Sequence, residues 1–566
     1  MKIKWEFYPD HDTKLINDMI QQLKIPKPLA KVLCNRGLDK VDEIREFLMP
    51  ECTKLHDPFL LKDMEKAVDR ITLALRERER IMVFGDYDVD GVTSIALVYK
   101  FLKDLGGDVL YFVPDRNIDG YGLSLSGLAL AKEKGCNLVI SVDCGITSIA
   151  EVQYANSNEI DVIITDHHEP GDVLPDAVAI VDPKQNGCMY PFKDLAGVGV
   201  AYKLAQGILM KLEMDLSYVE KYLDLVAVGS AADFVPIVSE NRIFVKLGLR
   251  KLNSEGSEGL LALAEVAGVN QTQITVNNVV FGLAPRLNAV GRLGHATLAV
   301  ELLLTKNYSQ ALRIARTLEE ENEKRKLIDK ETLNNALEKI ESECDPNSDN
   351  AIILAGENWH QGVIGIVASR IIERFHRPTV MISLEDGIGK GSARSIPGFD
   401  LHAALQSCSD LFIQFGGHKY AAGLTIKEDN IPEFRNRFMD IAEEFLSNKD
   451  MIPRIKIDDV IELGDVTYDL VMMIDKLAPF GPGNNLPIFA SYGVNVVGEP
   501  RIVGSNHLKF KVSQNGIYLD AIAFNRGEDK GLLQQNRFVN IAFYAEENVW
   551  MNKKTLQLRI KDIQVD

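Results

Sequence analysis

The sequence is poor in the features of secreted, membrane-embedded or disulfide-stapled proteins. Its cysteines number only seven, and no two have the Cys-x-x-Cys spacing, so neither a disulfide framework nor a zinc knuckle is predicted. No run approaches the ~20 consecutive apolar residues of a membrane span, and residues 1–7 have no signal-peptide core. We therefore expect a cytoplasmic protein without membrane association.

Positive charge is also scarce. Lysine and arginine total 63 against 81 acidic residues, which gives a net charge of −18. Tight non-specific binding to long duplex DNA normally needs a basic surface, so the composition argues against it. An enzyme with a local basic groove is still compatible with this charge, because part of the negative charge would belong to metal-binding acids.

Histidine is rare, with ten residues, yet two are adjacent in Asp166-His167-His168. This triplet follows the β-branched run 161–165, which predicts a buried parallel strand. The apolar runs 81–84 and 138–142 predict two more strands that end in acids. Since the carboxyl ends of parallel strands meet at one edge of a sheet, we expect a ligand site there.

The acids expected at this edge are Asp86, Asp88, Asp90, Asp143, Asp166 and Asp233, the last at the end of the helical pattern 223–232. Two carboxylates about 4 Å apart repel by roughly 4 kcal/mol at an effective dielectric near 20, so the cluster needs cations or protons. Carboxylates with imidazoles suit Mn²⁺ and Mg²⁺, and shared carboxylates suit a pair of ions. Asp182 also follows an apolar run but precedes Pro183, which is a turn signal, and we leave it out.

The rest of the chain predicts further domains in an α/β protein. Strands and helices alternate over 81–235 and again over 346–450, whereas 1–80 is a helical lead-in and 236–345 a helical connection with a long charged helix. Short alternating strands over 451–566 predict a small β-barrel. The glycine-rich segments 389–395 and 416–423 are expected to be loops that approach phosphates.

The acid motifs resemble, in order and spacing, those of the DHH phosphoesterase superfamily, and within it the RecJ family. The quoted residues are Asp86-Tyr87-Asp88-Val89-Asp90-Gly91, Asp143, Asp166-His167-His168 and Asp233. The resemblance implies a DHH catalytic domain over 81–235, a DHH-associated substrate-binding domain over 346–450 and an OB-like nucleic-acid-binding barrel over 451–566. It also implies a metal-dependent exonuclease that hydrolyses single-stranded DNA 5′→3′ to 5′-mononucleotides in DNA repair and recombination.

Residue roles follow from the acid pattern and the resemblance together. Two Mn²⁺ or Mg²⁺ ions are expected on Asp88, Asp90, Asp143, Asp166, His167 and Asp233. Asp86 and His168 are the expected catalytic residues, Asp86 as an additional ligand and His168 as a hydrogen-bond donor to the scissile phosphate. Phe84 stands where many superfamily members have a histidine, and Asp86 could compensate for it.

Substrate-binding residues come from the resemblance alone. They are Arg116, Tyr121, Arg286, Asn288, Arg292, Ser392, Arg394, Ser395 and His418. Without the family, Arg116 would be interpreted as a surface arginine in a glycine turn, and the segment 282–292 as a capped loop.

Single-stranded DNA is the partner that the resemblance implies, with a helicase and a single-strand-binding protein handing it over to a monomer. The main alternative is a DHH-family phosphodiesterase acting on short oligonucleotides or cyclic dinucleotides, for which the barrel would be superfluous. A manganese pyrophosphatase and a non-catalytic nucleic-acid-binding subunit are the other candidates. The nearly complete acid set argues against the non-catalytic one.

Overall fold

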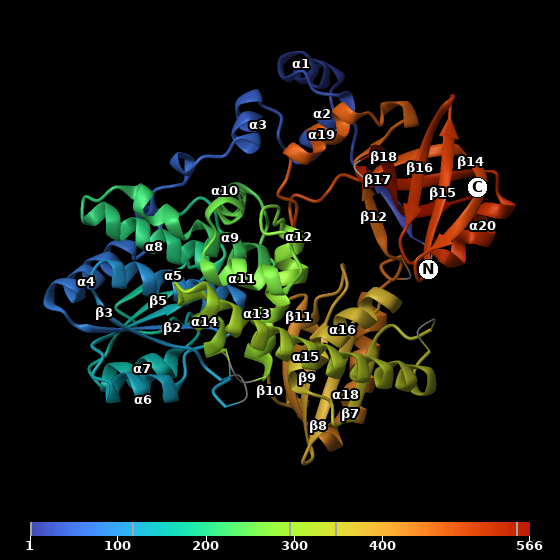
Figure 1. Cartoon of the computed structure of the whole chain (residues 1–566). Coiled ribbons are helices and arrows are strands. Elements are labelled where there is room, and N and C mark those ends of the chain that lie inside the picture. Colours follow the sequence, from blue (N-terminus) through green and yellow to red (C-terminus); the bar gives the residue numbers. More distant parts are fainter. Residues whose placement is uncertain are drawn as a thin grey trace. The chain divides into compact units, whose positions relative to one another are not determined.

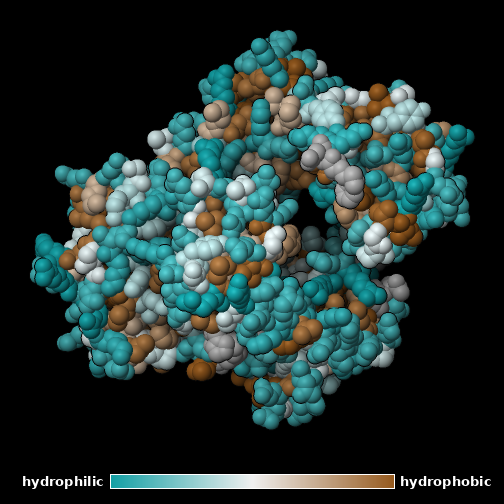
Figure 2. Space-filling model, viewed as in Figure 1, coloured by the Kyte–Doolittle hydropathy of each residue, from teal (hydrophilic) through white to brown (hydrophobic). Residues whose placement is uncertain are grey.

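The computed structural model describes residues 3–115, 118–120, 122–293, 296–345, 348–447, 449–550 and 553–565 (Figure 1). The chain divides into two compact units. The larger contains Trp5–Asn288, Ala296–Arg316 and Lys456–Asp566, and the smaller contains Met1–Lys4, Ala289–His295 and Thr317–Ile455. Figure 2 shows that the face in view is mainly hydrophilic, with hydrophobic residues scattered over it.

A parallel sheet forms the centre of the larger unit. Its strands are β2 (Arg80–Gly85), β3 (Asp108–Phe112), β4 (Leu138–Val142), β5 (Asp161–Thr165) and β6 (Ala179–Val181). They lie in the order β3-β2-β4-β5-β6, and all neighbours are parallel. Because β3 and β4 flank β2 on opposite sides, the strand order reverses between β2 and β4. Open α/β sheets bind ligands at the carboxyl ends of the strands at such a point.

Helices cover both faces of this sheet. They are α4 (Met64–Glu77), α5 (Val89–Asp104), α6 (Leu125–Glu133), α7 (Ile149–Ser157) and α8 (Gly197–Lys211). In Figure 1, α6 and α7 lie on one face, and α4, α5 and α8 lie on the other. Every residue of β4 is buried, as expected of a sheet covered on both sides.

Further helices follow the sheet in the sequence. They are α9 (Leu223–Ala232), α10 (Ser239–Glu255), α11 (Glu258–Val266), α12 (Val276–Asn278), the π-helix η4 (Val279–Leu283), α13 (Ala284–Leu293) and α14 (Thr297–Leu304). Two of them, α9 and α14, pack against α5. Residues 223–231 of α9 are all buried, because this helix lies between α5 and α10. A helix that is apolar on all sides belongs in such a place.

The carboxyl-terminal strands form a closed barrel. They are β13 (Asp459–Val460), β14 (Phe489–Val503), β15 (His507–Gln514), β16 (Ile517–Ala523), β17 (Phe538–Trp550) and β18 (Lys553–Gln564). The sheet closes because β14 pairs with both β15 and β17. Two helices accompany the barrel strands, α19 (Tyr468–Lys476) and α20 (Lys530–Gln535). The α/β class with an OB-like barrel is thereby confirmed.

The amino-terminal lead-in differs from the prediction in two ways. Besides α1 (Thr13–Leu23), α2 (Lys27–Asn35) and α3 (Val41–Leu48), it contains the strand β1 (Lys4–Phe7), which pairs with β12 (Arg454–Ile457). Its helices also share one hydrophobic core with α19 and the barrel. Both features depend on partners more than 400 positions away in the sequence, so no local pattern could reveal them.

The smaller unit has a mixed sheet in the order β10-β11-β9-β8-β7. Its elements are β7 (Ile352–Glu357), α16 (Gln361–Phe375), β8 (Thr379–Glu385), β9 (Ile388–Arg394), α17 (Leu401–Gln406), β10 (Phe412–Gly417), β11 (Ala421–Lys427) and α18 (Ile431–Phe445). The glycine-rich segments are therefore mainly antiparallel strands and not loops. A Cβ on Gly389 or Gly391 would overlap Ile382 or Leu424, so the glycines allow close packing.

The long charged helix is α15 (Tyr308–Glu343). A run of charges is typical of a helix in solvent, but one face of α15 is buried: Asn322 and Asp329 are fully enclosed, and Asp329 pairs with Arg370 at 2.9 Å. Charge periodicity alone could not reveal this, because the partner Arg370 belongs to α16. In the part of the chain that the structure describes, no helix is both long and apolar enough to cross a bilayer.

A buried ion pair supports α8. Lys203 Nζ lies 2.8 Å from Glu240 Oε1, and both side chains are almost completely enclosed. Glu240 also accepts hydrogen bonds from the Tyr190 hydroxyl (2.6 Å) and the His56 backbone (2.9 Å). The pair thus joins the lead-in, α8 and α10.

We predict that Glu240→Ala lowers the free energy of unfolding of the larger unit by about 3–5 kcal/mol, because it leaves the Lys203 ammonium buried without a partner. Urea denaturation followed by circular dichroism measures this change. The matched control is Glu43→Ala, which removes the exposed pair with Lys40 and should leave the unfolding midpoint unchanged. Equal midpoints for both variants would contradict the prediction.

Candidate metal centre

Acidic side chains gather at the carboxyl edge of the parallel sheet. Asp86 and Asp88 follow β2, and Asp88 caps α5 by accepting a hydrogen bond from the Gly91 backbone (3.0 Å). Asp90 lies in the first turn of that helix, and Asp143 follows β4 directly. All four therefore come from strand ends that the sheet order places side by side.

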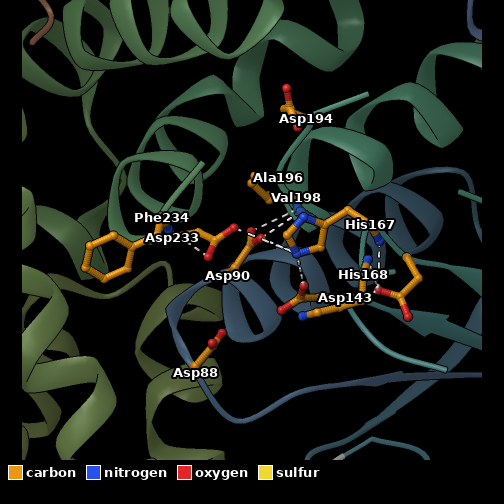
Figure 3. A network of polar contacts seen from close by, with 12 residues as sticks. Asp88, Asp90, Asp143, His167, His168, Asp194, Ala196, Val198, Asp233 and Phe234 are labelled. Carbon is orange, nitrogen blue, oxygen red and sulfur yellow. Dashed lines mark hydrogen bonds and ion pairs between the residues drawn. The ribbon is translucent and has the colours of Figure 1, made fainter. Parts of the chain in front are cut away.

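Two more segments complete the cluster. Asp166, His167 and His168 follow β5, and Asp233 is the first residue after α9. Figure 3 shows the side chains of Asp90, Asp143, His167 and Asp233 pointing toward one another.

His167 is the centre of the cluster. Its Nε2 atom lies 3.1 Å from Asp143 Oδ1, 3.8 Å from Asp233 Oδ2 and 3.9 Å from Asp90 Oδ2. Burial lowers the pKa of His167 to about 4. The imidazole is therefore neutral at pH 7, the form in which a histidine binds a metal ion.

Three overlapping groups of side chains could hold a metal ion. They are Asp143 with His167 and His168, Asp90 with His167 and Asp233, and Asp86 with Asp88 and Asp143. Within each group the ligand atoms lie within 4.8 Å of one another. Asp143 and His167 each belong to two groups, and such sharing is typical of sites for paired ions.

Asp90 is held by the amino terminus of α8. Its Oδ2 accepts a hydrogen bond from the Gly197 backbone (2.6 Å), and its Oδ1 accepts one from the Val198 backbone (2.9 Å). Helix amino termini stabilise negative charge. Residue 197 must be glycine for Asp143 to lie so close to the start of α8, because a Cβ at this position would lie 2.5 Å from Asp143 Oδ1.

Asp143 has a strained backbone. Its φ of 59° lies in the left-handed region, which side-chain-bearing residues seldom adopt and which is often found at functional sites. A hydrogen bond from its N–H to Thr165 O (2.9 Å) holds this conformation. The sharp turn places the carboxylate beside His167.

The cluster is electrostatically unfavourable for its own acids. Burial, followed by repulsion from neighbouring carboxylates, raises the pKa of Asp90 and Asp143 well above the usual range. The pKa of Asp88 is also raised, by burial and by Asp233. Bound cations would favour the ionised forms of all three side chains.

Asp166 is bonded differently from the other acids. Its Oδ1 accepts a hydrogen bond from the His167 backbone (2.7 Å) and contacts His168 Nδ1 (2.7 Å), and its Oδ2 accepts one from Ile146 N (2.9 Å). Although burial opposes ionisation, these donors lower the pKa of Asp166. Within the part of the chain that the structure describes, Asp166 belongs to none of the three groups.

The structure gives the residues of this edge different surroundings. Asp166, which is expected to bind a metal ion, has oxygens that accept hydrogen bonds from backbone amides and contact His168. Asp86, expected as an additional ligand, and His168, expected to contact the phosphate, both lie in metal-compatible groups. Sequence order could not distinguish these surroundings, because all three residues follow strands at the same edge.

The donor set fits a divalent cation. Asp143 Oδ1 and Asp233 Oδ2 are buried oxygens without a hydrogen-bond partner among the described residues, and buried oxygens normally have one. Carboxylates combined with imidazole are ligands that Mn²⁺ binds well and Mg²⁺ tolerates. The residues present therefore fit ions of this kind.

The predicted residues near α13 have different surroundings. Asn288 Oδ1 accepts a hydrogen bond from Val89 N (3.1 Å), which places it beside the first turn of α5. Arg286 Nη1 donates to Gly282 O within its own helical segment (2.6 Å). Arg292 Nη1 donates to Gly362 O in the smaller unit (2.7 Å). Arg116 and Tyr121 lie outside the described residues.

The remaining predicted residues belong to the smaller unit. Arg394 Nη1 donates to Ser392 Oγ on the same strand, β9 (3.1 Å). Ser395 N donates to Tyr420 O (3.0 Å), and His418 N donates to Ala421 O (2.8 Å). The four side chains thus come from neighbouring strands at one end of this sheet.

Three further residues lie at or beside the site, and only one of them, Phe234, was not considered from the sequence. Phe234, directly after Asp233, is 93% exposed, and an aromatic residue beside a ligand is the signal that could have found it. Asp182 is buried at the end of β6, where burial and then Asp166 raise its pKa to about 8. Phe84 is buried and packs on Phe112, with ring centroids 5.0 Å apart, so it belongs to the core.

We predict that Gly197→Ala weakens Mn²⁺ binding about 10–100-fold, the usual effect of losing an outer partner of a ligand. The added methyl group would displace Asp143 and disturb the amides that hold Asp90. Isothermal titration with Mn²⁺ measures the change. Gly199→Ala, on the same helix, is the control, since its Cβ would meet Leu195 Cδ2 at 3.3 Å and Phe244 Cε2 at 3.6 Å and no atom of the metal centre among its nearest neighbours. Equal affinities of the two variants would contradict the proposed geometry.

Known families match the chain in three places. Residues 80–230 match the DHH family, N-terminal domain, residues 348–445 match the DHHA1 domain, and residues 457–562 match the RecJ OB domain. The single-stranded-DNA-specific exonuclease RecJ of Bacillus subtilis (strain 168) is 40% identical over 570 residues, covering 100% of this chain and 71% of that protein. The protein of the same name from Escherichia coli (strain K12) is 36% identical over 563 residues, covering 95% of this chain and 96% of that protein.

Solved structures agree with these matches. RecJ from Thermus thermophilus in complex with Mn²⁺ has a TM-score of 0.85 at 31% identity, covering 100% of this chain and 80% of that one. The same protein in complex with Mg²⁺ has a TM-score of 0.80 at 28% identity, covering 100% of this chain and 79% of that one. With the three domain matches and relatives that align along almost its whole length, the chain belongs to the RecJ family of the DHH superfamily.

Proposed function

We propose that the chain is a metal-dependent exonuclease that hydrolyses single-stranded DNA 5′→3′ to 5′-mononucleotides, in DNA repair and recombination. The observation that carries the proposal is the set of overlapping ligand groups that share Asp143 and His167. The relatives' name, single-stranded-DNA-specific exonuclease, supports the substrate. The direction of cleavage rests on the family resemblance.

In this proposal Asp88, Asp90, Asp143, His167 and Asp233 hold two Mn²⁺ or Mg²⁺ ions, with Asp86 as an additional ligand and Asp166 as the residue that orients the triplet. Such ions would supply an acidified water and neutralise the charge that develops on the phosphate. The protein's own part is to aim the carboxylates at one point and to offset part of the cost of ionising them in a buried cluster. The Gly197 and Val198 amides serve Asp90 in this way.

His168 is proposed to donate a hydrogen bond to the scissile phosphate. Burial disfavours its cationic form, but the bond to Asp166 outweighs this and raises the pKa of His168 to about 9. The imidazole is therefore protonated at pH 7 and can donate to an anionic oxygen. Asp166 binds Nδ1, so Nε2 is the atom directed to substrate.

The barrel is proposed to bind the single strand. On β14 and β15, Arg501 lies directly opposite Lys509, and both are exposed. Like charges opposite each other destabilise a sheet, unless an anion lies over them. Phe524, 48% exposed, contacts His507 of β15, with ring centroids 5.0 Å apart, and could stack on a base, as aromatics do in single-strand-binding barrels.

The remaining parts of the proposal rest on the resemblance. Arg116, Tyr121, Arg286, Asn288 and Arg292 would contact the strand near the metal ions, and the smaller unit would add Ser392, Arg394, Ser395 and His418. The domains would be 81–235 for catalysis, 346–450 for substrate and 451–566 for the single strand. A cytoplasmic monomer would receive the strand from a helicase or a single-strand-binding protein.

End-labelled DNA tests the proposed function. With Mn²⁺ and an oligonucleotide of about 30 nucleotides, longer than one OB-fold site, we expect immediate release of a mononucleotide from a 5′ label, and gradual shortening of a 3′-labelled strand. A blunt duplex should remain intact. Survival of the strand while dinucleotides or cyclic dinucleotides are consumed would overturn the substrate assignment but leave the metal centre.

Ligand substitution tests the chemistry separately. Loss of a residue that only hydrogen-bonds to a metal ligand reduces activity by up to ~100-fold. Asp143→Ala and His167→Ala should each reduce turnover by more than this, because both residues belong to two ligand groups. Circular dichroism should show an unchanged fold. Near-wild-type turnover in either variant would contradict the assignment of the metal centre.

A further inference from the structure

A second site lies at the other end of α5. A pocket of about 390 Å³ is lined by Lys100 and Lys103 of α5, by Lys221 and Tyr222, and by Lys306. Asp90, in the metal centre, precedes Lys100 by ten positions, or about 15 Å along the helix. The pocket is therefore distinct from the metal centre, and four lysines in a chain with net charge −18 make it unusual.

The acids around this pocket are already engaged. Asp104 accepts hydrogen bonds from Lys221 Nζ and the Tyr222 hydroxyl, both at 2.6 Å. Asp224 accepts hydrogen bonds from the backbone N–H of Leu225 (3.0 Å) and Ser257 (2.9 Å). The pocket therefore holds lysines that its own carboxylates do not bind directly.

Those lysines are Lys100, Lys103 and Lys306. None of them forms an ion pair with a residue that the structure describes. Lys100 Nζ donates to Leu303 O at 3.2 Å. Burial lowers the pKa of Lys100, and the nearby charges of Lys306 and Lys221 lower it further against the opposing effects of Asp224 and Asp104. An anion between the lysines would remove this repulsion.

Aromatic walls extend the pocket on one side. An adjoining cavity of about 540 Å³ shares Tyr99, Leu304 and Lys306 with it and adds Tyr111 and the acid Glu301. The rings of Tyr99 and Tyr111 are nearly perpendicular, with centroids 5.4 Å apart. Ligand sites for small molecules typically measure about 300–1,000 Å³ and combine apolar walls with a few polar groups. Amines beside flat aromatic walls suit a molecule with both a phosphate and a planar ring.

We propose that this pocket binds a phosphate-bearing ligand of nucleotide size. Lys100, Lys103 and Lys306 bind the phosphate, and Tyr99 lies against the base. The pocket is connected to the metal centre by two helices that pack together (Figure 1). Helix α5 contains both Asp90 of the metal centre and Lys100 of the pocket. Helix α9 contains Asp224 of the pocket in its first turn and ends directly before Asp233.

Calorimetric titration of the full chain tests the proposal. The probes are dAMP and inorganic phosphate, with EDTA present so that no metal ion recruits them to the metal centre. Wild type and Asp143→Ala should bind dAMP equally. Lys306→Glu should weaken binding by about tenfold or more, since it replaces a charge-assisted contact with repulsion. Lys134→Glu, an exposed lysine of the same unit, should bind like wild type.

The variants keep the proposal falsifiable. Lys306 and Lys103 are exposed, so Lys306→Glu and Lys103→Glu should unfold at the wild-type temperature and serve as independent tests. Absence of dAMP binding to wild type, or unchanged binding by both variants, overturns the proposal. A single-stranded oligonucleotide is the third probe. If Lys306→Glu weakens its binding but not that of dAMP, the phosphate belongs to a DNA strand and the small-molecule assignment is wrong.

Discussion

Repulsion among buried carboxylates is the constraint on which the larger unit depends. Charges about 4 Å apart interact with roughly 4 kcal/mol at an effective dielectric near 20, and Asp90 and Asp143 are almost fully enclosed beside each other. The fold reduces this repulsion with aligned backbone amides: the start of α8 binds Asp90, and residues 146 and 167 bind Asp166. Asp143 and Asp233 keep oxygens that no hydrogen bond of the described structure satisfies, and these define where cations fit.

The position of α8 therefore matters beyond its own packing. Its first residue, Gly197, donates to Asp90 and allows Asp143 to approach. Further along the same helix, Lys203 forms the buried pair with Glu240. A buried ion pair is seldom a large net gain in stability, but it is sensitive to displacement of either partner. We infer that the pair keeps α8 in register with the strand ends that carry the acids.

Local patterns predicted the elements better than their assembly. The strands that carry Asp86, Asp143 and Asp166 were predictable because each is a short apolar run ended by an acid. The pairing of β1 with β12 and the barrel core shared with the lead-in were not, since both join distant segments. The strands in the glycine-rich segments were missed because β9 has glycines where Ile382 and Leu424 pack.

The candidate site was likewise predictable in part: its members could be collected from the sequence, but their hydrogen bonds could not. The order of the acids in the sequence is enough to collect them at one edge, because parallel strands share a direction. It does not say which oxygens the backbone already occupies, so the hydrogen bonds that Asp166 accepts from residues 146 and 167 were not predictable. They depend on how the triplet folds against the neighbouring strand end.

Net charge is a poor guide to where anions bind on this chain. Acids outnumber bases in the chain, but some of the acids lie in the metal centre, where cations would offset them. Others, such as Asp224, accept hydrogen bonds from backbone amides. Basic side chains are instead placed locally: Arg501 faces Lys509 on the barrel, and Lys100 lies near Lys221 and Lys306 beside α5. Like charges held together in this way raise the energy of the ligand-free protein. A bound phosphate lowers it again, so such places, and not the overall balance, indicate where phosphates bind.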